Sequence, residues 1–192
     1  MRQNHDRDEG RARLTFILFA FVVLALSLNE AVYDFAVANS VYETSQEATY
    51  VGLTFLIAYV AEIVTSFFLS GLSDKPNRIR LFAGLQVLML LAFLGTAMVI
   101  IWAPKQLTLL WSLTFVFDAL NHLARLFMFA IIPLLFSGRE LWRANGIMAI
   151  GAGLSRSLGP IAVGIIGFGN GNYELLVILV VCVLLSSFIT LQ

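Results

Sequence analysis

Hydrophobic residues gather in six long runs along the chain, and short polar segments separate the runs. Each run is close to the length of about 20 residues that a helix needs to cross a bilayer. None of the runs alternates polar and apolar residues as the strands of a membrane barrel do. The pattern therefore predicts a polar tail at residues 1–13 and six transmembrane helices, with spans at approximately 14–38, 50–69, 81–102, 107–135, 141–167 and 173–191.

The composition supports an integral membrane protein. Of the 192 residues, 59% are hydrophobic and 12% are charged, whereas soluble domains are about 25% charged. This composition predicts the lipid bilayer as a partner. The formal net charge is zero and the charged residues lie mainly in short loops, so nucleic acid is not expected as a partner. Asn29 and Glu30 follow the first apolar run where a signal peptide would have small residues, so this run is expected to be a membrane helix. The single cysteine, Cys182, excludes an intramolecular disulfide.

Basic residues lie mostly on one side of the predicted spans. Besides the arginines of the tail, that side holds Lys75, Arg78, Arg80, Arg139 and Arg143. The loops on the other side hold only Lys105. Because cytoplasmic loops are enriched in Lys and Arg, this asymmetry predicts that both termini lie in the cytoplasm.

Apart from Glu174 at the very start of the sixth run, acidic, basic and histidine side chains inside the spans occur on the first, second, fourth and fifth predicted helices. A charge at the bilayer centre costs about 2.5–3.5 kcal/mol, so these groups cannot all face lipid. We expect the four helices to share a polar interior, with the third and sixth helices against lipid. The candidate substrate or proton pathway consists of Glu30, Asp34, Glu62, Asp118, His122, Arg125 and Arg156.

Helical spacing brings several of these groups together. Glu30 and Asp34 are four residues apart and share one helical face, and Asp118, His122 and Arg125 share another. Such groups can be ion pairs that only hold the bundle together, or they can form a pathway for a substrate or an ion. Their restriction to alternate helices favours the pathway.

The chemistry of each side chain indicates a role in that pathway. Carboxyls that are removed from water bind protons more readily, and histidine titrates near neutrality. Glu62, Asp118 and His122 are therefore candidates for proton coupling. Arg125 and Arg156 would keep the carboxylates charged or bind an anionic part of a substrate.

The segment 70–81, S-G-L-S-D-K-P-N-R-I-R-L, is the densest cluster of charge between two apolar runs. Pro76 cannot continue a helix, and it disfavours helical geometry at Lys75. Asn77 is one of the few residues other than glycine that tolerate a left-handed conformation. We therefore expect a tight hairpin between two membrane helices.

This hairpin resembles the signature loop between the second and third helices of the major facilitator superfamily, roughly G-x-L-[AS]-D-[RK]-x-G-R-[RK]. The matching residues are Leu72, Ser73, Asp74, Lys75 and Arg78. Ser70 and Asn77 replace the two glycines, and Ile79 stands where a basic residue is common. The resemblance implies a cytoplasmic gating loop formed by Asp74, Lys75, Arg78 and Arg80.

The fifth predicted helix carries a second resemblance to this superfamily, in the segment R-A-N-A followed by G-P-x-x-G-G that is associated with proton-coupled exporters. The matching residues are Arg143, Ala144, Asn145, Gly159, Pro160 and Gly164. Gly151, Ser155 and Gly159 also recur every four residues, a stripe that permits close helix packing with or without transport. Pro160 is expected to bend the helix.

The preceding residues, L-A-R-L-F-M-F-A-I-I-P-L-L-F-S-G-R-E-L, resemble the branch that includes the enterobactin exporter and macrolide efflux proteins. The resemblance implies an all-α fold of six helices in a 3+3 inverted repeat, which is half of a major facilitator fold. It also implies a bacterial inner membrane location and proton-coupled export of a small amphipathic molecule by alternating access. A second six-helix half would come from a longer chain, from another copy or from a partner, since we expect this chain to be truncated or to assemble.

Two other functions remain open: a non-transporting membrane scaffold, regulatory protein or inactive fragment with the same half-transporter fold, and a small channel. The size of the protein in mild detergent would separate a monomeric scaffold from a dimer with a complete path.

Enzymatic, cofactor and metal chemistry are not expected. Gly153-Leu154-Ser155-Arg156 departs from the G-x-S-G segment of a serine protease, and no phosphate-binding loop occurs. Two histidines and one cysteine are too few for a typical metal centre.

Overall fold

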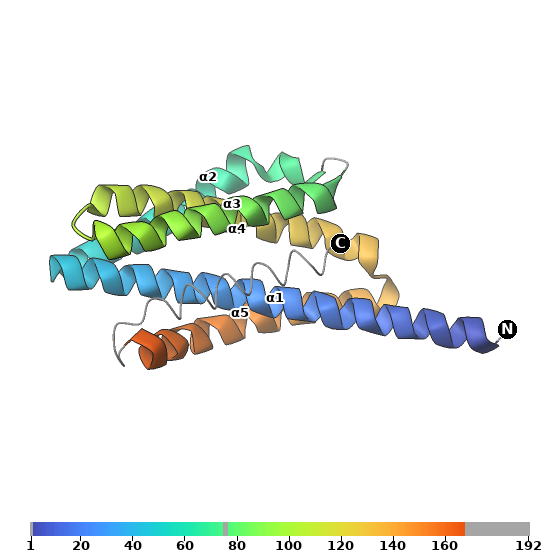
Figure 1. Ribbon diagram of the computed structural model, residues 1–192. Helices are drawn as coiled ribbons and strands as arrows, with labels where there is room; N and C mark the ends of the chain where they lie inside the picture. The colour runs from blue at the N-terminus through green and yellow to red at the C-terminus, as the bar shows by residue number, and fades with distance from the viewer. Residues whose placement is uncertain (1, 75–76, 168–192) are drawn as a thin grey trace.

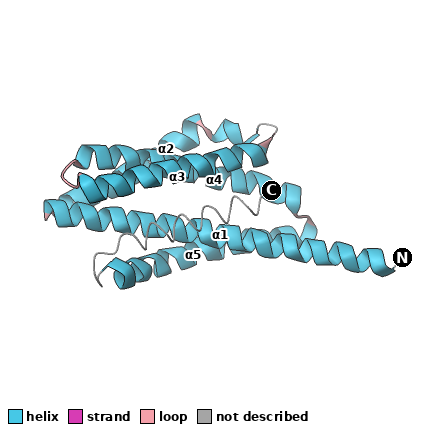
Figure 2. Ribbon diagram, viewed as in Figure 1, coloured by secondary structure: helices cyan, strands magenta, loops and turns pink. Residues whose placement is uncertain are grey.

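A computed structural model of the protein describes residues 2–74 and 77–167. These residues form only helices and contain no strand (Figure 2). The elements are α1 (Arg2–Ser45), α2 (Ala48–Phe68), the 3₁₀ helix η1 (Ser70–Asp74), α3 (Arg78–Trp102), α4 (Leu107–Leu135) and α5 (Gly138–Gly167). The sixth predicted span, 173–191, lies outside the described residues.

Four helices among the described residues are long and apolar enough to cross a membrane: Leu14–Ser45 of α1, and α2, α3 and α4. α5 has 30 residues but is less apolar, because its first turns carry Arg139, Glu140 and Arg143. α1 begins at Arg2, so the segment assigned to a polar tail continues the first helix. Polar residues such as Arg and Glu have high helix propensity, and polarity alone therefore does not end a helix.

The helices form two groups that meet along α1 (Figure 1). α5 packs along α1, while α2 and α3 pack on either side of α4, and α1 contacts α2. α4 therefore occupies the centre of its group, and its buried face includes Phe117, Asp118, Asn121 and Phe127. The exposed side of α3 includes Leu88, Leu91 and Met98, as expected for a helix against lipid.

An aromatic contact joins α1, α3 and α4 in the interior. The ring of Tyr33 stacks on that of Phe117, with centroids 3.7 Å apart and planes at 21°. The Tyr33 hydroxyl shares a hydrogen bond of 3.1 Å with the Thr96 hydroxyl. A buried tyrosine needs such a partner for its hydroxyl. This contact fixes how α1 is rotated relative to the other two helices.

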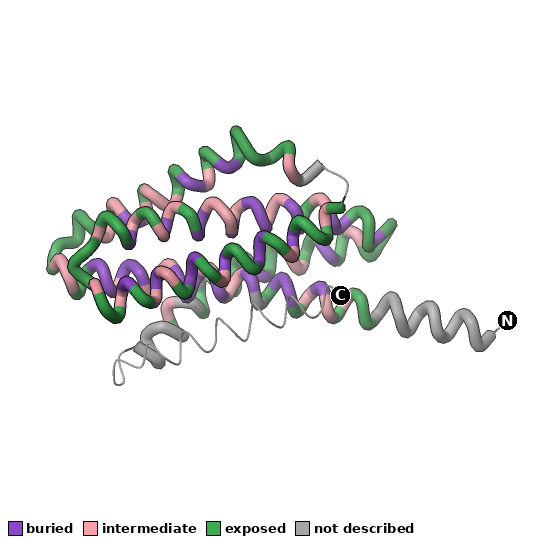
Figure 3. The backbone as a smooth tube through the Cα atoms, turned by 45° about the horizontal axis from the view of Figure 1, so that its top comes forward, coloured by how far each residue is buried: buried purple, intermediate pink, exposed green. Residues whose placement is uncertain are grey.

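α2 is held firmly at its amino-terminal end. Trp111 of α4 donates a hydrogen bond from Nε1 to the Thr54 hydroxyl at 3.0 Å. Its ring also stacks on that of Tyr50, with centroids 5.9 Å apart. At the other end of α2, Phe67 and Phe68 are about 80% exposed, and the tube is mostly exposed where it approaches η1 (Figure 3). α2 is thus the least buried of the four helices that are long and apolar enough to cross a membrane.

The two turns that flank α2 have left-handed residues. Asn77 has φ 75° and ψ 31° and precedes the first turn of α3, which confirms the prediction for this position. Gln46 has φ 56°, and its N–H donates to the Tyr42 carbonyl at 2.8 Å. The loop between α1 and α2 therefore covers only residues 46–47, whereas the hydrophobic pattern predicts a loop at residues 39–49.

The predicted small-residue stripe lies in α5, where the structure includes Gly151, Ser155, Gly159, Pro160 and Gly164. Gly151 packs closely against α1. A Cβ atom at this position would lie 3.0 Å from Val23 Cγ1 and 3.3 Å from Ser27 Oγ. The close approach predicted for this part of the stripe is therefore confirmed at Gly151.

A bulky side chain at Gly151 is expected to push α5 away from α1. Gly151→Leu should lower the free energy of unfolding by about 1–3 kcal/mol, as overpacking does in other cores. The measurement is unfolding of the protein in mixed micelles by a denaturing detergent. Gly153→Leu is the matched control, because a Cβ atom there meets nothing within 4 Å. Equal effects of the two substitutions would contradict the packing described for Gly151.

Candidate functional site

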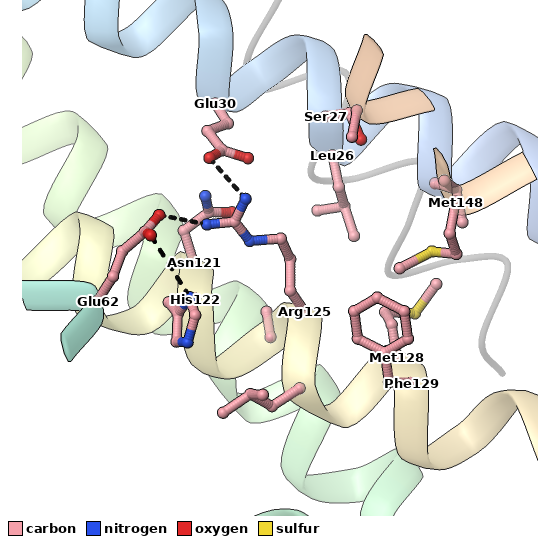
Figure 4. Close-up of a pocket in the computed structure, with 14 residues that line it drawn as sticks. Leu26, Ser27, Glu30, Glu62, Asn121, His122, Arg125, Met128, Phe129 and Met148 are labelled. Atoms are coloured by element: carbon pink, nitrogen blue, oxygen red, sulfur yellow. Dashed lines mark hydrogen bonds and ion pairs between the residues drawn. The ribbon is translucent and has the colours of Figure 1, made fainter. Parts of the chain in front are cut away.

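Arg125 of α4 connects three helices through one guanidinium group (Figure 4). Its Nη1 lies 2.9 Å from Glu30 Oε1 on α1, and its Nη2 donates to Glu62 Oε1 on α2 at 2.5 Å. The three side chains are 22–34% exposed, so the group is neither fully buried nor free in solvent. A planar guanidinium presents several donors in fixed directions, which suits a bridge between two carboxylates.

His122 lies one helical turn before Arg125 and also faces α2. Its Nε2 shares a hydrogen bond of 2.8 Å with the Ser66 hydroxyl. Its Nδ1 lies 4.0 Å from Glu62 Oε2, the carboxylate oxygen that Arg125 does not contact. Glu62 thus lies between a permanent cation and a group that can gain a proton.

We call the first of two adjoining cavities the acidic cavity. It has a volume of about 400 Å³ and is bordered by four carboxyl groups and by Arg125. The carboxyl groups belong to Glu30, Asp34, Glu62 and Asp118. Asp118 is 5% exposed, and its Oδ2 has no hydrogen-bond partner among the described residues. No three His, Cys, Asp or Glu side chains in that part of the chain are placed to hold a metal ion.

The second cavity, called here the amphipathic cavity, has a volume of about 290 Å³. Its polar end is formed by Glu30, Glu62, Asn121, His122 and Arg125. Its other end is formed by apolar side chains, among them Leu26, Met128, Phe129 and Met148 (Figure 4). Glu30, Glu62, Arg125 and Ala152 border both cavities, so the two spaces adjoin at the bridge.

The structure brings six of the seven predicted pathway residues to these two cavities, namely Glu30, Asp34, Glu62, Asp118, His122 and Arg125. For Arg156 the structure describes the backbone in α5, four residues after Ala152, which borders both cavities. α3 borders neither cavity, in agreement with its predicted place outside the polar interior. α5 contributes the small and apolar residues Met148 and Ala152.

The predicted gating loop is only partly described. Asp74 is the last residue of η1, and Lys75 lies outside the described residues. Arg78 donates from Nη1 to the Ala130 carbonyl of α4 at 3.0 Å, and Arg80 is exposed. Arg78 therefore fastens the hairpin to α4 close to Pro133, which lies inside that helix.

Several residues of the site were not predicted from the sequence. Ser66, Asn121 and Met128 border or complete it, and each lies three or four residues from a predicted site residue. Helical spacing could therefore have indicated Ser66 from Glu62 and Asn121 from Asp118. The apolar residues give no such signal, because methionine and phenylalanine occur throughout the spans.

Comparison of the chain with models of known families, with curated proteins and with solved structures gives no match.

Removal of the Arg125 guanidinium is expected to destabilise the bundle, because Glu30 and Glu62 would remain unpaired in a partly buried position. Arg125→Met should lower the free energy of unfolding by about 1–3 kcal/mol. Glu62→Gln should cost less in that background than in the native protein, since it removes one unpaired charge. The measurement is unfolding in mixed micelles, with the exposed Arg139→Met as control. Independent, additive effects of Arg125→Met and Glu62→Gln would argue against the ion pair.

Proposed function

We propose that this chain is a six-helix half of a secondary active transporter of the major facilitator type. It exports a small amphipathic molecule in exchange for protons by alternating access. The observation that carries the proposal is the bridge from Arg125 to Glu30 and Glu62, whose residues border both an acidic cavity and an amphipathic one.

The exposure of the bridge supports a second half. Charged groups inside a membrane face a water-filled cavity or another protein surface rather than acyl chains. Glu30, Glu62 and Arg125 lie well inside their helices and keep about a quarter to a third of their surface exposed. In the proposal, that open side faces the second six-helix half across an aqueous cavity.

The helix pairing also supports the proposed inverted repeat. In a 3+3 arrangement, α1 corresponds to α4 and α2 corresponds to α5. α1 packs along α5, and α4 packs along α2, so the first helix of each triplet contacts the second helix of the other. This pairing is the one expected when the two three-helix repeats pack against each other in a symmetric way.

The position of Glu62 supports proton coupling. Protonation of its carboxyl would weaken the bond to Arg125 and thereby loosen α2 from α4. His122 Nδ1 lies 4.0 Å from Glu62 Oε2, so a proton would pass between them through one water or after a small movement. Asp118 and Asp34 offer further carboxyls in the acidic cavity. In the proposal, proton binding and a change in helix arrangement are thus linked through one ion pair.

The location and orientation belong to the same proposal. The basic residues favour a cytoplasmic side that contains both termini and the η1 hairpin. The contact of Arg78 with the Ala130 carbonyl supports a role for the hairpin at the cytoplasmic gate, because it joins the loop to a helix that borders both cavities. The proposed membrane is the bacterial inner membrane.

Proton-coupled flux tests the proposal directly. Full-length protein in liposomes with an entrapped pH dye is exposed to 4-phenylbutyltrimethylammonium or to 4-phenylbutanesulfonate, two permanently charged amphipathic probes. At least one probe should drive proton movement, and Glu62→Gln and Asp118→Asn should each reduce it about tenfold or more, because the proton-binding groups are lost.

Glu47→Gln is the matched control, since Glu47 is an exposed carboxylate at the start of α2 and borders neither cavity. Absence of proton movement with both probes would overturn the transporter proposal in favour of a scaffold. Unaltered coupling in both variants would remove the assigned proton sites.

A further inference from the structure

The amphipathic cavity has two chemically different ends, and this division constrains what can bind. Figure 4 shows the carboxylates, Asn121 and His122 on one side of Arg125, and Leu26, Met128, Phe129 and Met148 on the other. Methionine side chains are flexible and adapt to apolar groups of different shape. A ligand that fills the cavity therefore carries a polar group at one end and an apolar body at the other.

The charge balance at the polar end favours a positive group. The two cavities are bordered by four carboxyl groups and by one guanidinium, with His122 as the only other titratable base among the described residues. Carboxylates close to one another in a partly buried site repel, so a proton or a cation stabilises them.

Arg125 is already neutralised by its two partners. Its Nη1 pairs with Glu30 and its Nη2 pairs with Glu62, so two carboxylates surround one positive charge. An anionic ligand at this guanidinium would be repelled by both carboxylates. The expectation that Arg125 binds an anionic part of a substrate is therefore not favoured by this geometry.

Glu62 presents the acceptor that the ion pair leaves open. Arg125 donates its hydrogen bond to Oε1, and Oε2 lies 4.0 Å from His122 Nδ1. Nδ1 itself has no hydrogen-bond partner among the described residues. Glu62 is also the most exposed of the three bridge residues, so a ligand can reach this oxygen from the cavity.

The geometry points to an amphipathic organic cation as the substrate class. Its positive group lies at Glu62 Oε2, and its apolar body lies against Met128, Phe129 and Met148. This inference rests on the proposed transport function and adds the sign of the charge and the orientation of the substrate. Cation and proton then compete for the same carboxylate, and binding of one favours release of the other.

Equilibrium binding tests the inference apart from transport. Full-length protein in nanodiscs of phosphatidylglycerol and phosphatidylcholine, which carry no primary amine, is titrated with three probes that share one apolar body. The probes are 4-phenylbutyltrimethylammonium, the neutral 4-phenylbutanol and 4-phenylbutanesulfonate. The cation should bind about tenfold or more tightly than the other two, because only it pairs with the open carboxylate oxygen.

Two variants separate the ends of the cavity. Glu62→Gln should remove the preference for the cation, so that the cation and the alcohol bind alike. Met128→Ala should weaken all three probes while the order of affinities is kept, since it shortens only the apolar end. Glu47→Gln should leave binding unchanged, and size-exclusion profiles confirm that each variant is folded.

The outcomes distinguish the two proposals. Tighter binding of the sulfonate, or an unchanged preference for the cation in Glu62→Gln, overturns the cationic substrate class even when sulfonate-driven proton flux supports a transporter. Failure of all three probes to bind also overturns it. Preferential binding of the cation that depends on Glu62, without proton flux in liposomes, supports the site and overturns transport.

Discussion

The bridge between Arg125, Glu30 and Glu62 is the interaction on which the arrangement of α1, α2 and α4 depends. In a medium of low dielectric constant an unpaired charge is expensive, whereas a paired one is tolerated. The fixed directions of the guanidinium donors require two helices to present their carboxylates to a third at defined rotations. The buried stack of Tyr33 on Phe117 sets the same relative rotation of α1 and α4 by packing alone.

The residues of the bridge also line both cavities. Because Glu30, Glu62 and Arg125 border both spaces, any charge that enters one space changes the electrostatic potential in the other. Two separate binding events can therefore influence each other without a long pathway of intermediates. The proposed exchange of a proton for a cation needs no more than this shared boundary and a helix that can move.

Much of this arrangement could be predicted from the sequence, because charged residues in apolar helices face the interior of the bundle or an aqueous cavity rather than lipid. The spacing of Glu30 with Asp34, and of Asp118 with His122 and Arg125, indicates the faces that meet. The sequence does not indicate which carboxylates Arg125 selects, since this depends on how neighbouring helices are rotated and offset along their axes. It also does not distinguish apolar residues at the cavity, such as Met148, from apolar residues that face lipid. The span is predicted to begin at residue 14, as it does in the structure, but the pattern does not show that the helix extends back to Arg2, because polar residues can continue a helix.

α2 is attached to α4 near both of its ends. Trp111 donates to Thr54 near the amino-terminal end, His122 bonds to Ser66 near the other end, and Phe67 and Phe68 beyond it are exposed. Each residue advances an α-helix by about 1.5 Å, so Glu62 lies about 12 Å and Phe68 about 21 Å from Thr54. If the Ser66 contact opened, the Trp111 contact would become the pivot, and a displacement at the Glu62 carboxylate would be nearly doubled at Phe68, where the chain enters the η1 hairpin. The indole ring of Trp111 at the pivot would serve as an intrinsic fluorescent probe of this motion. The phenyl rings of Phe67 and Phe68 at the far end would present a broad apolar surface.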